Sequence, residues 1–147
     1  MNFLVSSRAR VEHENLAIVP HIIISISTPG HRRSNPVRNE HTLGVIQLRF
    51  HDLDRMPEPS AAAHEVYGPI VLFDTRHARA VIDLVNDHCL DMKAVIVHCD
   101  AGLSRSPALA AALAKKMNGD DDYFFRDYTP NRHVYRVMTE ELQNVEW

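Results

Sequence analysis

The stretch that decides the fold of this 147-residue chain is VIVHCDAGLSRSP, which runs from Val95 to Pro107. Its first residues are apolar and β-branched, as is typical of a strand buried on both faces of a sheet. The residues that follow are rich in alanine and leucine, and a proline in the first turn of a helix costs little because first-turn N–H groups have no helical acceptor. The sequence therefore predicts a strand at 94–97, a tight turn at 100–104 and a helix that closes near 118–119.

The turn between that strand and that helix is suited to hold an anion beside a nucleophile. Free N–H groups in a tight turn, together with the positive end of the helix dipole, favour a bound anion. The same groups favour the thiolate form of Cys99, which precedes the turn. Arg105 adds a planar fork that can bind two oxygens of a tetrahedral oxyanion, and Gly102 can supply a positive φ. Ser104 and Ser106 bring hydroxyls that could hydrogen-bond the sulfur or a leaving phosphate.

The segment at 98–107, His-Cys-x-Ala-Gly-x-Ser-Arg-Ser-Pro, resembles the signature of the cysteine-dependent protein tyrosine phosphatases, most of all their dual-specificity branch. A bare Cys-x5-Arg would be weak evidence, but here it lies between a predicted strand and an alanine-rich helix. The resemblance implies a phosphocysteine mechanism with Cys99 as the nucleophile, and no metal and no cofactor. The residues that it implies for phosphate binding are Asp100, Ala101, Gly102, Leu103, Ser104 and Arg105.

Such a mechanism also needs a carboxylic acid that protonates the leaving oxygen, which contributes roughly 10²–10⁴-fold. The family places this aspartate just after the strand that precedes the helix before the signature. In this chain that strand is predicted at 43–50, and Asp52 is the first carboxylate after it. Asp54, two residues further on, is the alternative. Asp74 is a third candidate, but capping of the helix that follows it is a sufficient reason for that residue.

Three further residues match the family pattern. His98 precedes the nucleophile and would fix its environment by hydrogen bonding, and Ser106 would stabilise the sulfur as it leaves. Asn131, in the segment YTPNRHV, would brace the signature loop, cap the following helix, or do both. Cys89 could trap an oxidised Cys99 as a disulfide, although a buried bystander thiol is the simpler interpretation.

The chain departs from the family pattern in the length of the segment after the acid. Asp52 lies further before Cys99 than is usual in the smaller dual-specificity enzymes. The excess at 56–73 is predicted to be an insertion, rich in proline at both ends, with a helical turn at 61–66. We expect it to border the active-site cleft and help to select substrate, with a neutral surface excursion as the alternative.

Further strands are predicted at 22–27 and 43–50, and further helices at 74–88, within 120–128 and over 131–145. Strands that alternate with helices indicate an α/β fold. We expect a central, mainly parallel sheet of about four to five strands flanked by helices, with the Cys-x5-Arg loop between a central strand and a helix. The phosphatase resemblance implies the same fold.

The composition, 45% hydrophobic and 24% charged, is that of an ordinary globular protein, and we expect a single phosphatase-like domain over residues 1–147. The net charge of −3 favours neither nucleic acid nor an anionic membrane as a partner. No apolar run approaches the ~20 residues of a membrane span. Two cysteines argue for a reducing compartment, so we expect a cytoplasmic protein. Ten histidines lie without metal-ligand spacing, so no metal site is expected.

The resemblance and these residues together predict a tyrosine or dual-specificity phosphatase that acts on phosphorylated proteins or small phosphomonoesters. Asp100 adds negative charge within Cys-x5-Arg, which disfavours polyphosphorylated substrates. The basic residues Arg32, Arg33 and Arg38 could meet an acidic partner, although a solvated loop is the simpler interpretation. The alternative function is a catalytically weak phosphate-binding pseudo-phosphatase, and a third is a sulfur-transfer or arsenate-reducing enzyme with Cys89 as its resolving thiol.

Overall fold

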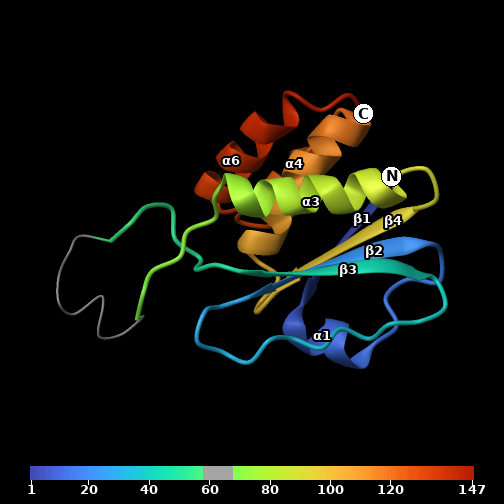
Figure 1. Cartoon of the computed structure of the whole chain (residues 1–147), viewed down its shortest axis with the longest axis horizontal. Helices are drawn as coiled ribbons and strands as arrows, with labels where there is room; N and C mark the ends of the chain where they lie inside the picture. The colour runs from blue at the N-terminus through green and yellow to red at the C-terminus, as the bar shows by residue number, and fades with distance from the viewer. Residues whose placement is uncertain (58–67) are drawn as a thin grey trace.

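A four-stranded sheet, in which all paired strands run parallel, organises the part of the chain that the structure describes (Figure 1). The computed structural model of the protein describes residues 1–57 and 68–147. The strand order is β1-β4-β2-β3, so β4 is central. The strands are β1 (Asn2–Ser7), β2 (His21–Ser27), β3 (Thr42–Arg49) and β4 (Ala94–Cys99). The expected mainly parallel sheet, with the signature after a central strand, is confirmed.

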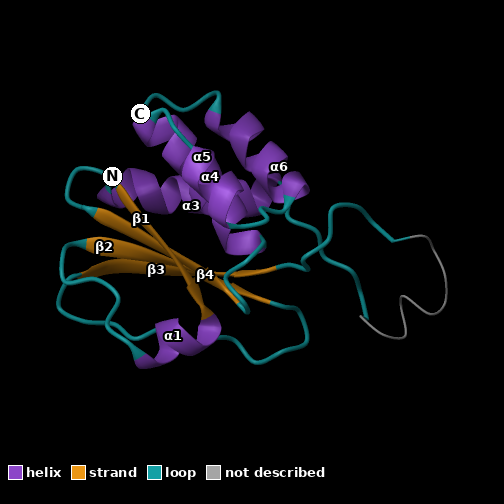
Figure 2. Cartoon of the chain, turned by 180° about the vertical axis from the view of Figure 1, so that it is seen from behind, coloured by secondary structure: helices purple, strands orange, loops and turns teal. Residues whose placement is uncertain are grey.

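Helices cover both faces of this sheet, as Figures 1 and 2 show from opposite sides. The larger group packs on one face, and the short α1 lies on the other. The helices are α1 (Arg8–His13), α3 (Thr75–His88), α4 (Arg105–Asn118), α5 (Asp122–Asp127) and α6 (Arg132–Leu142). Every residue of β2 and of β4 is buried, as expected of strands with both faces covered. No helix in the described ranges has the length and apolarity to cross a bilayer.

The helix after the signature begins and ends where local chemistry dictates. Its first residue is Arg105, so Pro107 lies within the first turn, where a missing N–H leaves no helical bond unmade. Gly119 closes the helix with φ +80° and donates its N–H to the Lys115 carbonyl. The ten residues from Arg105 to Ala114 are all buried, and the alanines among them let the helix approach the sheet closely. α3 begins after Asp74, which caps it as predicted.

The sequence analysis predicted neither β1 nor α1. β1 is an edge strand whose apolar run, Phe3 to Val5, is only three residues long, which is too short to identify a strand from the sequence. α1 has six residues, of which only Val11 is buried, so it has too few turns for a helical pattern. Their arrangement matters for the site, because β1 pairs with β4 along its whole length.

The predicted insertion at 56–73 needs correction at its carboxyl end. Phe73 is a core residue, 1% exposed, whose ring meets that of Phe50 edge to face at 5.0 Å. The His51 N–H donates to the Val71 carbonyl at 2.7 Å, and the Val71 N–H donates to the His51 ring at 3.1 Å. The chain has therefore rejoined the core by Val71. The expected helical turn at 61–66 lies outside the described residues.

Candidate active site

Cys99 is the last residue of β4 and is 3% exposed. Its Sγ accepts a hydrogen bond from the Gly102 N–H at 3.3 Å and lies 3.2 Å from the Ser106 hydroxyl. One contact comes from the middle of the signature loop and the other from the first turn of α4. The loop is therefore wrapped around the sulfur, with donors on two sides of it.

The carbonyl groups of the loop face outward, onto neighbouring segments. Three of them accept backbone N–H groups from outside the loop: Asp100 from Arg8 at 3.1 Å, Leu103 from Thr129 at 3.1 Å and Ser104 from Asn131 at 3.0 Å. A trans peptide points its C=O and the next N–H in opposite directions, and no described peptide bond is cis. The N–H groups of Ala101, Ser104 and Arg105 consequently point to the inner side, where the Gly102 N–H already meets the sulfur. This is the geometry of an anion-binding loop.

Gly102 is required here for two reasons. Its φ of +75° lies in the left-handed region, as the sequence predicts. A Cβ at this position would also lie 2.8 Å from the carbonyl carbon and oxygen of Ser6. The end of β1 therefore supports the loop from behind, and only a residue without a side chain fits between them.

The guanidinium of Arg105 is held by the ends of three adjacent strands. It donates to the Phe50 carbonyl at 2.9 Å, to the Thr28 hydroxyl at 3.1 Å and to the Asp100 carboxylate at 3.1 Å. These residues directly follow β3, β2 and β4, respectively. Because the arginine is only 5% exposed, little water reaches its guanidinium, and these acceptors stabilise the buried positive charge.

Asp100 acts as a counter-ion to two arginines. Its Oδ2 accepts from the Thr28 hydroxyl at 2.8 Å and from Arg105, and its Oδ1 lies 3.8 Å from the Arg8 guanidinium. Burial raises the pKa of this carboxyl, but the hydrogen bond from Thr28 and the charge of Arg105 outweigh burial and lower the pKa below its ordinary value. The Asp100 side chain is thus ionised and anchors the fork.

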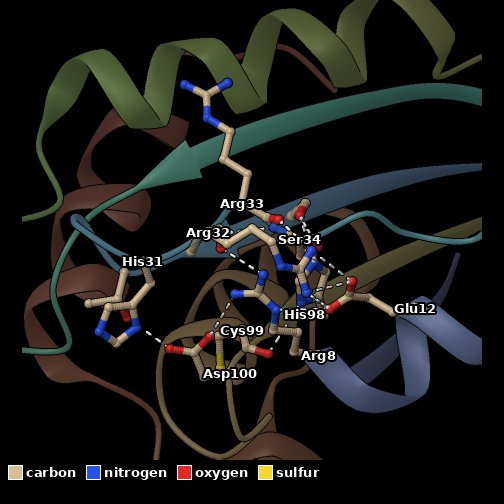
Figure 3. Close-up of polar contacts among 12 residues, drawn as sticks. Arg8, Glu12, His31, Arg32, Arg33, Ser34, His98, Cys99 and Asp100 are labelled. Carbon is tan, nitrogen blue, oxygen red and sulfur yellow. Dashed lines mark hydrogen bonds and ion pairs between the residues drawn. The ribbon is translucent and has the colours of Figure 1, made fainter.

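His98, wholly buried, organises the backbone of Cys99 (Figure 3). Its Nε2 lies 2.6 Å from the Ser25 hydroxyl and 2.9 Å from the Ser34 hydroxyl, and its Nδ1 lies 3.2 Å from the Cys99 carbonyl. A carbonyl can only accept, so Nδ1 carries the proton and Nε2 accepts from a serine. Burial lowers the pKa of His98, so the neutral ring is the stable form. Sequence reasoning missed both serines, because only the fold brings them to the histidine.

Asp52 contacts the signature loop directly. Its Oδ1 accepts from the Ser104 hydroxyl at 2.8 Å and from the Asn131 side-chain amide at 2.9 Å. Asp52, Asp54, Ser104 and Asn131 all line a cavity of about 250 Å³ at the edge of the loop. Both candidate acids therefore reach the same space, and Asp52 is the one that is hydrogen-bonded to the loop.

Asn131 contacts both the candidate acid and the first turn of the following helix. Its side-chain oxygen accepts the Val134 N–H at 3.0 Å and caps α6, while its amide group donates to Asp52. Its backbone N–H also donates to the Ser104 carbonyl. One residue therefore braces the loop, orients the candidate acid and starts a helix.

The basic loop after β2 is partly committed to contacts within the chain, which Figure 3 shows around Glu12. Arg32 lies 3.3 Å from the Glu12 carboxylate, and Arg8 donates to the same carboxylate at 2.9 Å. Arg8 also donates to the Arg32 carbonyl at 2.6 Å. Arg33 points away from this group, and its guanidinium lies 3.5 Å from the Gln47 side chain.

Cys89 and Cys99 lie at opposite edges of the sheet. Cys89 is the C-cap of α3, just before β4 begins, whereas Cys99 ends β4. Six residues of strand span about 20 Å, and a disulfide needs Cα atoms within about 7 Å. The geometry therefore gives no support to Cys89 as a resolving thiol.

Among residues 1–57 and 68–147, one group of carboxylates has the spacing of a metal site, and it does not include Cys99. The Asp120, Asp121 and Asp122 oxygens lie within 4.8 Å of one another at the start of α5. Asp121 already accepts a hydrogen bond from the Tyr135 hydroxyl. Asp120 and Asp122 are exposed, and exposed acidic groups are common without an ion.

The parallel sheet, with Cys-x5-Arg between its central strand and a helix, defines a cysteine-based phosphatase fold of the dual-specificity type. A sequence profile of the tyrosine phosphatase family matches residues 8–146. The chain belongs to this family.

Solved structures agree with the fold. Human DUSP28 is 13% identical, with a TM-score of 0.59 over 96% of this chain and 91% of that chain. The human tyrosine phosphatase-like serine/threonine/tyrosine-interacting protein is 19% identical, with a TM-score of 0.51 over 85% of this chain and 74% of that chain. No curated protein sequence matches this one. At such identities the similarity extends to the fold alone.

Proposed function

We propose that the protein hydrolyses phosphomonoesters through a phosphocysteine intermediate. The observation that carries the proposal is the loop wrapped around Cys99, with the Gly102 N–H on the sulfur and the loop carbonyls turned outward. Such a loop binds a phosphate in front of the thiolate. Arg105 supplies the positive charge at its edge.

In the first step the Cys99 thiolate attacks phosphorus in line with the leaving oxygen. The S–P bond forms as the P–O bond breaks, and protonated Asp52 gives its proton to the departing oxygen. Arg105 and the inward N–H groups bind the equatorial oxygens, whose charge is greatest in the transition state.

In the second step the Asp52 carboxylate takes a proton from water, and the water oxygen attacks phosphorus. The S–P bond breaks, which returns the thiolate and releases inorganic phosphate. The Ser106 hydroxyl, 3.2 Å from Sγ, donates to the sulfur as its negative charge returns.

Two contacts support Asp52 over Asp54 as the acid. Among the described residues, Ser104 and Asn131 each donate a hydrogen bond to the carboxylate of Asp52, and both bonds are to Oδ1. They fix the carboxyl plane and leave Oδ2 to carry the transferred proton. A fixed acid is worth more than a free one, because the leaving oxygen must lie within hydrogen-bond reach.

The proposed substrate class is a protein with a singly phosphorylated side chain. The five residues between Cys99 and Arg105 include no lysine or arginine. The two arginines next to the loop, Arg105 and Arg8, both contact Asp100, which neutralises part of their charge. A further arginine, Arg132, is in the lining of the active-site cavity. Little positive charge is left for a second phosphate.

The test is hydrolysis of p-nitrophenyl phosphate and of phenyl phosphate by the wild type and by the Cys99→Ser, Asp52→Asn and Asp54→Asn variants. Cys99→Ser should be inactive, and vanadate should inhibit the wild type. Asp52→Asn should lower kcat by roughly 10²–10⁴-fold on phenyl phosphate, with a smaller loss on p-nitrophenyl phosphate, whose leaving group needs a proton less. Asp54→Asn should stay within a few-fold of the wild type, and the reverse pattern would assign the acid to Asp54.

The alternative is a phosphate-binding module without turnover, which would use the same loop. Arg105 donates three of its five N–H groups within the protein, so two remain for a phosphate in either case. If the protein is such a module, it should bind inorganic phosphate or vanadate. The wild type and Cys99→Ser should then hydrolyse p-nitrophenyl phosphate and phenyl phosphate equally slowly.

A further inference from the structure

A second cavity, of about 450 Å³, lies beside the active-site cavity. Its lining residues come from the end of α5, the start of α6 and the segment that joins them. Figure 2 shows where α4, α5 and α6 lie. The two cavities share Thr129, Pro130 and Arg132 as a common wall. The remaining lining residues are aromatic: Phe125, Tyr128 and Tyr135.

The aromatic walls make this cavity apolar and uncharged on the side away from the active site. Phe125 is 45% exposed, although it is a large hydrophobic residue, and its ring meets that of Tyr135 edge to face at 5.0 Å. Phenols are neutral at physiological pH, and burial raises the pKa of Tyr135 and that of Tyr128 further, to about 12. The positive charge in the lining is that of Arg132, on the wall toward the active site. The cavity therefore suits an apolar group and offers no site for an anion away from that wall.

The position of the cavity relative to the phosphate loop is fixed by the backbone. Thr129 donates its N–H to the Leu103 carbonyl at 3.1 Å, and Asn131 donates its N–H to the Ser104 carbonyl at 3.0 Å. The segment that forms the shared wall is thus tied to the signature loop at Thr129 and at Asn131. The distance between a phosphate bound in the loop and a side chain bound in the second cavity would therefore be fixed.

We propose that this cavity, the Phe125 pocket, is a specificity subsite for a bulky apolar side chain next to the phosphorylated residue of a protein substrate. The proposal rests on the proposed function, which places the phosphorylated residue in the adjacent cavity. An extended peptide advances about 3.3 Å per residue, so the apolar side chain belongs within about three residues of the phosphorylated one. Burial of that side chain against the exposed Phe125 ring supplies the binding free energy.

The experiment uses the full chain with Cys99→Ser, so that bound phosphopeptides are not consumed. The probes are a set of phosphotyrosine peptides of polar sequence. Each peptide carries a single phenylalanine, placed at one of the three positions before or the three positions after the phosphotyrosine, and is compared with a peptide that has alanine at that position. Titration calorimetry should find one position at which phenylalanine improves Kd by about tenfold, which is about 1.4 kcal/mol. The added variant Phe125→Ala should remove this preference, and Phe125→Leu should restore part of it.

The matched control is Leu90→Ala, which truncates an exposed apolar side chain in the turn before β4 and should keep the preference. Equal affinity for all peptides, a preference that survives Phe125→Ala, or no measurable peptide binding would each overturn the subsite. Binding to phosphoinositide vesicles that depends on Phe125 would assign the pocket to a lipid chain and would also overturn it. Hydrolysis of phenyl phosphate by the wild type tests the proposed function separately, because that ester has no neighbouring residue to place in the pocket.

Discussion

Asn131 donates its side-chain amide to the Asp52 carboxylate at 2.9 Å, although the two residues lie 79 positions apart in the sequence. The same side chain accepts the Val134 N–H with its oxygen and so begins α6. The orientation of the candidate acid is therefore coupled to a helix cap. Variants that separate the two contacts can tell positioning of the acid from stability.

Asn131→Ser should retain the cap but lose the donor to Asp52, because the serine hydroxyl is too short to reach it. Asn131→Ala loses both contacts. We expect Asn131→Ala to lower the free energy of unfolding by about 1 kcal/mol and Asn131→Ser by less than half of that. Both should lower kcat on phenyl phosphate by roughly tenfold or more, part of the 10²–10⁴-fold that a general acid contributes, with little change in KM. Urea unfolding and steady-state kinetics measure these effects. Unchanged kcat in both variants would show that Asn131 does not position the acid.

Gly102→Ala should disrupt the loop far more than its conformational cost explains. A left-handed alanine costs about 1–2 kcal/mol, and here its Cβ would also meet the Ser6 carbonyl at 2.8 Å. The matched control is Gly30→Ala, which has φ +86° and nothing within 4 Å of the added Cβ. We expect Gly102→Ala to exceed the destabilisation of the control in urea unfolding, and to abolish hydrolysis that the control retains. Equal losses in the two variants would mean that β1 does not support the loop.

The signature could be predicted from sequence because its strand, loop and helix are contiguous. Local chemistry also set the helix boundaries, through the Asp74 cap and the left-handed Gly119. The surroundings of the loop could not be predicted in the same way. Thr28 and Ser25 reach it only because β2 lies beside β4 in the sheet, and no spacing in the chain encodes that neighbour relation.

The aromatic pair Phe50 and Phe73 shows where the sequence-based prediction was wrong. The proline-rich segment suggested a surface insertion up to residue 73, but Phe73 fills the core against Phe50. Composition identifies a loop but not the residue at which it returns to the core. Tertiary packing alone decides that point.

Thr28→Val should weaken phosphate binding more than it weakens the fold. The Thr28 hydroxyl donates to Asp100 at 2.8 Å and accepts from Arg105 at 3.1 Å, so it joins two charged groups. Valine keeps the shape but leaves each of them one partner short. The loss costs about 1–3 kcal/mol for a buried group such as Arg105 and less for Asp100, whose side chain is 38% exposed. We expect a raised KM for phenyl phosphate and weaker inhibition by vanadate. Thr75→Val, at an exposed position at the start of α3, is the control and should change neither. An unchanged KM in Thr28→Val would show that the fork of Arg105 does not depend on this hydroxyl.

The buried, neutral His98 should make the protein lose stability as the pH falls below about 6.5. Burial lowers the pKa of His98 below its usual 6.5 in the folded protein, whereas the unfolded chain takes up a proton near that value. Below pH 6.5 the unfolded state therefore binds more protons, and the free energy of unfolding falls by up to ~1.4 kcal/mol per pH unit from this residue until the folded pKa is reached. Burial also lowers the pKa of His77, which adds a contribution of the same sign. The wild-type slope alone does not isolate His98.

His98→Gln separates the two contributions when urea unfolding is measured from pH 8 to pH 5. The variant should be less stable at pH 8, because the contacts with Ser25 and with the Cys99 carbonyl are disturbed, but its stability should fall less steeply with acid. His13→Gln, at an exposed position of α1, should keep the wild-type slope. Parallel curves for the wild type and His98→Gln would mean that the native ring takes up the proton at Nε2. Ser25 and Ser34 would then have to accept hydrogen bonds from His98 rather than donate them. The assignment of a neutral His98 ring beside the Cys99 carbonyl would then be wrong.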